Sequence, residues 1–139
     1  MIKEFVPYEL ALKLKELGFD EEGFCNWEES WSPEPEDEIR MVLTTDQTWL
    51  RPGWICAPIF SQAFRWFRDK HDLFGKIEVL NFGADEYCFE IYNLFEEKTI
   101  YDNFQGAAAS YTGTFNTYEE SELACLEKLI EIVTKQQEQ

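Results

Sequence analysis

The chain has little of what metal sites and common active sites require. It contains one histidine, His71, and four widely separated cysteines: Cys25, Cys56, Cys88 and Cys125. Structural zinc sites usually draw ligands from closely spaced pairs such as CxxC, which are absent here. A P-loop and a dinucleotide-binding glycine motif are also missing. Adjacent carboxylates do occur, but 28 acidic residues make such pairs expected by chance. We therefore expect no catalytic residue, no metal and no cofactor, with His71 partly buried on the boundary of a helix.

The chain also lacks membrane and export signals. No run of about 18 apolar residues, which a membrane-spanning helix needs, occurs in it. The first 19 residues show neither the apolar run nor the small-residue cleavage site of a signal peptide. Both absences, with the unpaired cysteines, predict a cytoplasmic protein with reduced thiols.

Basic residues are scarce, and their distribution is uneven. Twelve Lys and Arg face 28 Asp and Glu, which gives a net charge of −16. Residues 1–38 and 85–139 each carry −9, whereas residues 39–84 carry +2. Such a field repels nucleic acid and anionic membranes and attracts basic protein surfaces. The common alternative is that the charge only keeps the protein in solution.

Apolar residues are plentiful, and their spacing predicts three helices. They make up 45% of the chain, and aromatics 17%, enough for a sizeable core. A helix is expected over 7–17, a second from Pro58 until Gly75 stops it, and a third from Thr117, where residues 117–120 form a capping box, to a polar tail from Lys135. Three apolar stripes should be buried in one core: Leu10, Leu14 and Leu17; Phe60, Phe64 and Phe67; Leu126, Ile130 and Val133.

Between these helices the pattern predicts strands and two long loops. Strands are expected over 24–27, 39–44, 76–82 and 87–94, and further strands over 99–101 and 108–115. Residues 28–38 form an acidic, proline-containing loop and 46–58 a second loop. The fold class is α+β: residues 1–139 form a single domain with an antiparallel sheet of about four to five strands and three helices packed on it.

The candidate interaction surface combines tryptophans, acidic residues and the arginines of the second helix. Tryptophan and arginine are enriched at binding hot spots, and proline-containing loops lose little backbone freedom on binding. The alternative is a purely structural role, in which the tryptophans lie in the core and the arginines pair with nearby acidic residues. The candidate residues are Trp27, Trp31, Glu34, Glu36, Asp37, Glu38, Trp49, Trp54, Arg65, Trp66 and Arg68.

Three stretches carry a family resemblance: residues 5–21, 57–68 and 117–130. In these stretches the chain resembles a group of small uncharacterised proteins of Bacteroidetes and their phages and prophages. The match covers nearly the whole length, but the loops over 28–38 and 46–54 depart from that group. The resemblance implies a phage or prophage gene acting in the bacterial host cytoplasm, and it carries over no catalytic residues.

Charge and resemblance together predict a non-enzymatic, acidic protein-binding module. It would cover a surface on a host or phage protein, with an anti-defence inhibitor as the specific form. Its partner would have a basic surface, without direct binding to nucleic acid or membrane. The alternatives are a small-ligand-binding or sponge protein with a pocket between the second helix and the sheet, a minor virion or cargo component, and an enzyme of unrecognised type.

Overall fold

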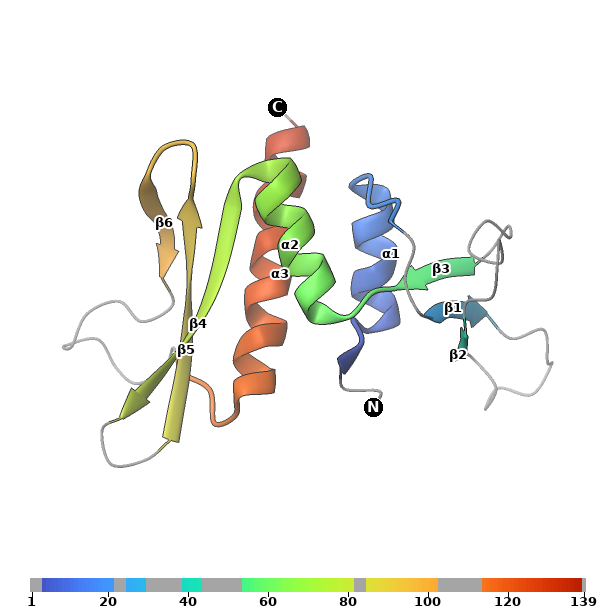
Figure 1. The fold of residues 1–139 in the computed structure, drawn as a ribbon, viewed down its shortest axis with the longest axis horizontal. Coiled ribbons are helices and arrows are strands. Elements are labelled where there is room, and N and C mark those ends of the chain that lie inside the picture. The colour runs from blue at the N-terminus through green and yellow to red at the C-terminus, as the bar shows by residue number, and fades with distance from the viewer. Residues whose placement is uncertain are drawn as a thin grey trace. The chain divides into compact units, whose positions relative to one another are not determined.

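The computed structural model describes residues 4–21, 25–29, 39–43, 54–81, 85–102 and 114–138 (Figure 1). The chain divides into two compact units, Met1–Ala63 and Phe64–Gln139, which are described separately below. Helix α2 (Phe60–His71) contains the boundary between them.

The first unit begins with helix α1, Tyr8–Glu16, inside the predicted 7–17. Pro7 precedes it, where a missing N–H costs no hydrogen bond. At the other end Gly18 adopts a φ of 104°, which favours glycine, and the Phe19 N–H donates to the Leu14 carbonyl at 2.9 Å. This is a Schellman ending, and it turns Phe19 back onto the helix, where it is buried.

A three-stranded antiparallel sheet completes this unit. Its central strand β1 (Cys25–Glu29) pairs with β2 (Ile39–Leu43) on one side and β3 (Trp54–Ala57) on the other. The strands predicted over 24–27 and 39–44 are thus confirmed. The first continues to Glu29, so the loop predicted over 28–38 is wrong at its start, because Glu28 and Glu29 pair with β2. Trp54–Ala57 was predicted as part of a loop, which is wrong, because these residues pair with Cys25–Glu28. The Val6 N–H donates to the Pro58 carbonyl at 2.8 Å and ties the segment before α1 to the end of β3.

In the second unit, α2 passes directly into strand β4, Leu73–Asn81. Only Asp72 separates them, with a φ of 56° in the left-handed region, and its carbonyl accepts the Leu94 N–H at 2.7 Å. The prediction that Gly75 ends this helix is wrong. The chain leaves the helix three residues earlier, and Gly75 lies within the strand.

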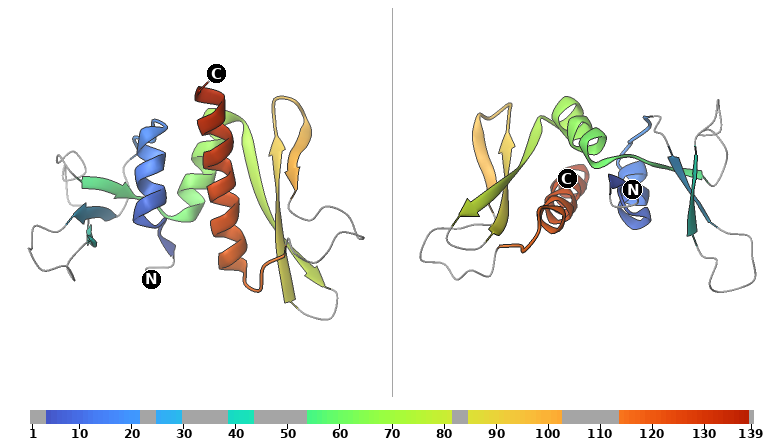
Figure 2. Two further views of the ribbon diagram at one scale, coloured as in Figure 1. Left: turned by 180° about the vertical axis from the view of Figure 1, so that it is seen from behind. Right: turned by 60° about the horizontal axis from the view of Figure 1, so that its bottom comes forward.

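Strand β4 forms an antiparallel sheet with β5 (Asp85–Asn93) and β6 (Lys98–Asp102), in the order β4-β5-β6. Helix α3 (Tyr118–Gln137) runs along one face of this sheet (Figures 1 and 2). Gly75 faces that helix, since a Cβ built there would lie 2.8 Å from Cys125 Sγ and 2.9 Å from Phe64 Cε1. Because side chains alternate along a strand, odd-numbered β4 residues face α3 and even-numbered ones face away.

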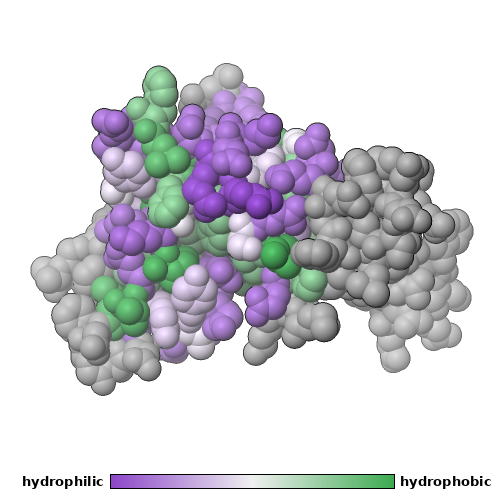
Figure 3. Space-filling model, viewed as in Figure 1, coloured by the Kyte–Doolittle hydropathy of each residue, from purple (hydrophilic) through white to green (hydrophobic). Residues whose placement is uncertain are grey.

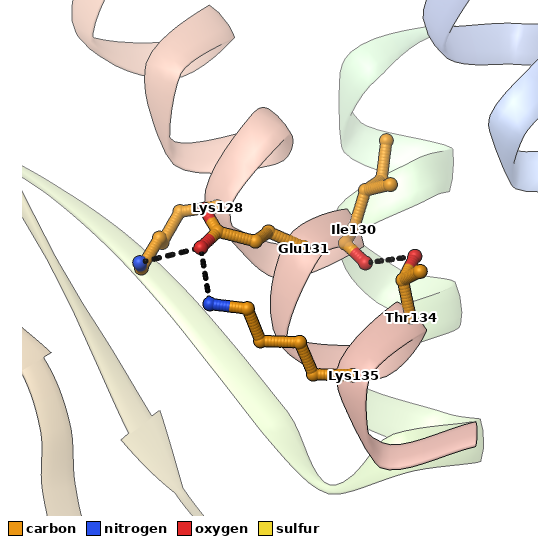
Figure 4. Close-up of polar contacts among 5 residues, drawn as sticks. All are labelled: Lys128, Ile130, Glu131, Thr134 and Lys135. Atoms are coloured by element: carbon orange, nitrogen blue, oxygen red, sulfur yellow. Dashed lines mark hydrogen bonds and ion pairs between the residues drawn. The ribbon is translucent and has the colours of Figure 1, made fainter. Parts of the chain in front are cut away.

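Helix α3 has a buried apolar side and an exposed polar side. Leu126, Leu129 and Val133 are fully buried. On the outer side Glu131 accepts from Lys128 at 3.3 Å and from Lys135 at 2.8 Å (Figure 4). The helix continues to Gln137, so the polar tail predicted from Lys135 is wrong at its start.

The capping box of α3 is confirmed on the threonine side. The Thr117 hydroxyl accepts the Glu120 N–H at 3.1 Å. The Glu120 carboxylate accepts the N–H of Asn116 at 3.3 Å, one residue before the donor of a standard capping box. The bond from the Glu120 N–H satisfies a donor that the start of a helix would leave unpaired, and the bond from Asn116 holds the segment just before the helix.

The α+β class, the three helices and the antiparallel pairing are confirmed. The described strands form two sheets of three, instead of the one sheet of four to five that was predicted. The hairpin of 76–82 and 87–94 and the strand at 99–101 are confirmed with longer bounds. The strand over 108–115 lies mostly outside the described residues, although Phe115 bridges to Tyr87. The single domain of residues 1–139 stays a prediction.

The three apolar stripes are buried, apart from Leu17, which is half-buried. That they share one core stays a prediction.

Candidate protein-interaction surface

The structure describes only part of the surface that the sequence predicts. Trp27 lies in β1 and Trp54 in β3, two paired strands of the first unit. The other loop residues of the prediction lie outside the described residues: Trp31, Glu34, Glu36, Asp37, Glu38 and Trp49.

Trp66 does not belong to an exposed surface. Only 3% of it is exposed, and its ring packs edge-on against Phe67, with centroids 5.0 Å apart. Its role in an interaction stays a prediction, and its burial favours the alternative that this tryptophan lies in the core. Arg65 is exposed, and the Arg68 guanidinium lies over the Phe74 ring, 5.7 Å from its centroid.

His71, at the end of α2, is half-buried, as predicted. Its ring packs edge-on against Trp66, with centroids 4.8 Å apart. Burial lowers the pKa of His71, and the neighbouring Asp72 carboxylate opposes this shift. The described surroundings of His71 are thus mainly aromatic, which suits packing better than proton transfer.

Two buried thiols lie in the second unit. Burial, helped by the carboxylates of Glu78, Asp102 and Glu90, raises the pKa of Cys88 to about 11. Burial likewise raises the pKa of Cys125, to which Glu122 adds. A nucleophilic cysteine needs a lowered pKa, so these two thiols are suited to packing and not to catalysis.

The raised thiol pKa values predict a loss of stability in alkaline solution. An unfolded thiol ionises near pH 8.5, so above that pH the unfolded chain releases protons that folded Cys88 and Cys125 retain. Stability should be fully present below about pH 8.5 and fall as the pH rises towards 11. Urea unfolding under reducing conditions at several pH values measures this. Cys88→Ala and Cys125→Ala should each flatten the decline, and an unchanged slope in both variants would contradict it.

The most exposed apolar residues of the described chain that lie together are at the turn between β5 and β6. Phe95 is 84% exposed, Leu94 42% and Phe74 36%. Phe74 lies opposite Tyr92 in the β4-β5 register, and Leu94 is the next residue on the same face of the sheet. Figure 3 shows hydrophobic residues over this turn at the upper left, beside hydrophilic ones. We call Phe74, Leu94, Phe95, Glu96 and Glu97 the turn surface.

Polar contacts, one local and one long-range in the sequence, fix the backbone of this turn. The Glu96 N–H donates to Asn93 Oδ1 at 2.8 Å, and the Leu94 N–H donates to the Asp72 carbonyl. Glu96 also pairs with Lys98 at 3.2 Å, and Glu97 has a left-handed φ of 55°. The exposed phenyl ring of Phe95 therefore stands on a backbone that is already fixed, which reduces the conformational entropy lost on binding.

Sequence reasoning missed the turn surface. Leu94 reads as the end of a strand, and nothing in the spacing shows that Phe95 points to solvent. The available signal was an apolar pair followed by the acidic pair Glu96-Glu97, directly after Asn93. Asparagine is common where a side chain accepts from the backbone of a turn.

Comparison of the chain with protein-family models, curated proteins and solved structures gives no match. The resemblance to Bacteroidetes and phage proteins therefore stays a prediction. Among the described residues, no three His, Cys, Asp or Glu side chains are grouped so as to hold a metal ion. None of the helices in the described ranges combines the length and apolar character needed to cross a membrane.

Proposed function

We propose that this chain is a non-enzymatic, acidic protein-binding module, encoded by a phage or prophage, that covers a surface of a host or phage protein. The observation that carries the proposal is the turn surface, where an 84% exposed phenylalanine stands beside two exposed glutamates. Exposed aromatics on a fixed backbone are typical binding anchors. Carboxylates beside such an anchor steer the approach of a basic partner.

The charge of the whole chain supports a basic partner. At −16 the protein attracts positively charged surfaces at long range, including surfaces that bind nucleic acid. An anti-defence inhibitor is the specific form of the proposal, in which the chain occupies such a surface. The nucleic acid normally held there would then compete with it.

The test begins with tagged protein recovered from infected host cells, whose partner is identified by mass spectrometry and then purified. Phe95→Ala should weaken binding to that partner by at least about tenfold, since hot-spot aromatics contribute about 2 kcal/mol or more. The matched control is Tyr118→Ala, which removes a 46% exposed aromatic beside Tyr87, at the start of β5, while the turn follows its end. Equal affinities of wild type and Phe95→Ala would exclude the turn surface.

Salt dependence tests the charge part of the proposal. The association rate should fall as the Debye length shortens from about 30 Å at 0.01 M salt to about 8 Å at 0.15 M. A flat rate would exclude electrostatic steering. Charge reversal of the predicted acidic loop (Glu34, Glu36, Asp37 and Glu38), if without effect on the rate and affinity, would remove that loop from the interface.

A further inference from the structure

Strand β4 is an edge of its sheet, and the part of the chain that the structure describes offers no strand on its outer side. The Leu94 N–H donates to the carbonyl of Asp72, the residue opposite it just before β4 begins. In antiparallel strands every second residue is hydrogen-bonded to its opposite residue, so the even-numbered residues of β4 bond to β5. Gly75, Ile77 and Val79 then direct their N–H and C=O groups outward. Val79 is also 60% exposed, as expected beside an open edge.

The sequence of β4 is self-complementary about Ile77. Lys76 and Glu78 flank it on the face away from α3, with side chains 52% and 37% exposed, and pair with each other at 2.8 Å. One step further, Gly75 stands against Val79, and beyond them Phe74 against Leu80. If a second β4 pairs antiparallel to the first, centred on Ile77, each charged residue lies opposite a residue of opposite charge. Each apolar residue then lies opposite another apolar residue.

We propose that β4 pairs with β4 of a second copy of this chain, antiparallel about a two-fold axis through Ile77, to give a six-stranded sheet. Ile77 then lies opposite Ile77 of the second copy as a hydrogen-bonded pair. Lys76 lies opposite Glu78 of the second copy, and Glu78 opposite its Lys76. Opposite charges directly across antiparallel strands stabilise the pair, and like charges destabilise it.

Two features oppose this association, and the first of them makes it selective. A lysine on an edge strand usually prevents pairing, but here a second copy offers a carboxylate to it. The net charge of −16 on each copy repels the other, so measurements belong at physiological salt, where this long-range repulsion is screened. A shift of one residue in the register would place Lys76 opposite an apolar residue, so the charges fix the alignment.

Charge reversal in full-length protein tests the register. In Lys76→Glu each opposed pair consists of two glutamates, and in Glu78→Lys it consists of two lysines. Because like charges then face each other across the strands, either variant alone should dimerise at least about tenfold more weakly than wild type. The two variants mixed should form a heterodimer, since every opposed pair is again of opposite sign. The double variant Lys76→Glu/Glu78→Lys should recover self-association. Sedimentation equilibrium at 0.15 M salt measures all four, and circular dichroism confirms that each is folded.

A backbone variant tests the edge independently of charge. Val79→Pro removes an outward N–H, leaves the β4-β5 ladder intact and should weaken dimerisation at least about tenfold, whereas Val79→Ala, the matched control, should not. A wild-type chain that sediments as a monomer would overturn the proposal. So would single charge variants that dimerise as wild type does, or a mixture of the two that stays monomeric.

Discussion

Replacement of Phe67 by alanine is expected to lower the free energy of unfolding by about 3–5 kcal/mol. Phe67 has no exposed surface and leads the fully buried side chains of the described chain by volume. Its ring packs against Trp66, and 5.9 Å separates its centroid from that of His71. The loss combines the transfer free energy of a phenyl ring with the cavity that remains. Urea denaturation followed by circular dichroism measures it.

Phe95→Ala is the matched control for Phe67→Ala. The same ring is removed from an 84% exposed position, so stability should change by no more than about 0.5 kcal/mol. Phe67→Ala should therefore unfold at lower urea concentration, while Phe95→Ala unfolds as wild type. Similar destabilisation in both variants would contradict the burial pattern of these two residues.

Gly75→Ala is expected to destabilise the second unit by about 1–3 kcal/mol. Elsewhere in a strand this change usually stabilises by about 0.4–1 kcal/mol, because alanine restricts the unfolded chain. At Gly75 the new methyl group would lie 2.8 Å from Cys125 Sγ and 2.9 Å from Phe64 Cε1. Overpacking should outweigh the entropic gain, because two buried side chains on separate helices would both have to move. Thermal or urea unfolding gives the sign directly, and a stabilised variant would contradict this packing.

A double-mutant cycle identifies the cause of this loss. Cys125→Ala removes the sulfur and should reduce the cost of Gly75→Ala, giving a favourable coupling of the size seen between contacting residues, about 0.5 kcal/mol or more. Gly18→Ala provides the contrast. Gly18 has nothing within 4 Å of its built Cβ but a φ of 104°, so its cost is backbone strain, and Cys125→Ala should leave that cost unchanged.

Periodicity and capping were enough to predict the helices and the β4-β5 hairpin. Leu10 and Leu14 mark the buried side of α1, and Thr117 marks the start of α3. The predicted end of α2 was wrong because glycine after an apolar stripe normally ends a helix. The actual determinant is Asp72 in a left-handed conformation held by a hydrogen bond from Leu94, a long-range contact that local patterns do not contain.

The candidate surface was less predictable than the fold. Trp66 and Arg68 are equally suited to an interface by residue type, and only the rotation of α2 shows that Trp66 is buried. The exposure of Phe95 depends on the turn between paired strands, which follows from the register of β5 with β6. Residue type therefore identifies amino acids that are common at interfaces, whereas tertiary packing decides which of them are accessible.

The single-residue link at Asp72 also limits which changes of chain length this protein tolerates. An insertion or deletion there would shift β4 by one residue and turn each of its side chains to the opposite face. Lys76 and Glu78 would then face α3, and Ile77 would face away from it. Substitutions at this junction keep the register of β4, whereas insertions and deletions shift it. Length variants among descendants of this gene should therefore accumulate elsewhere in the chain.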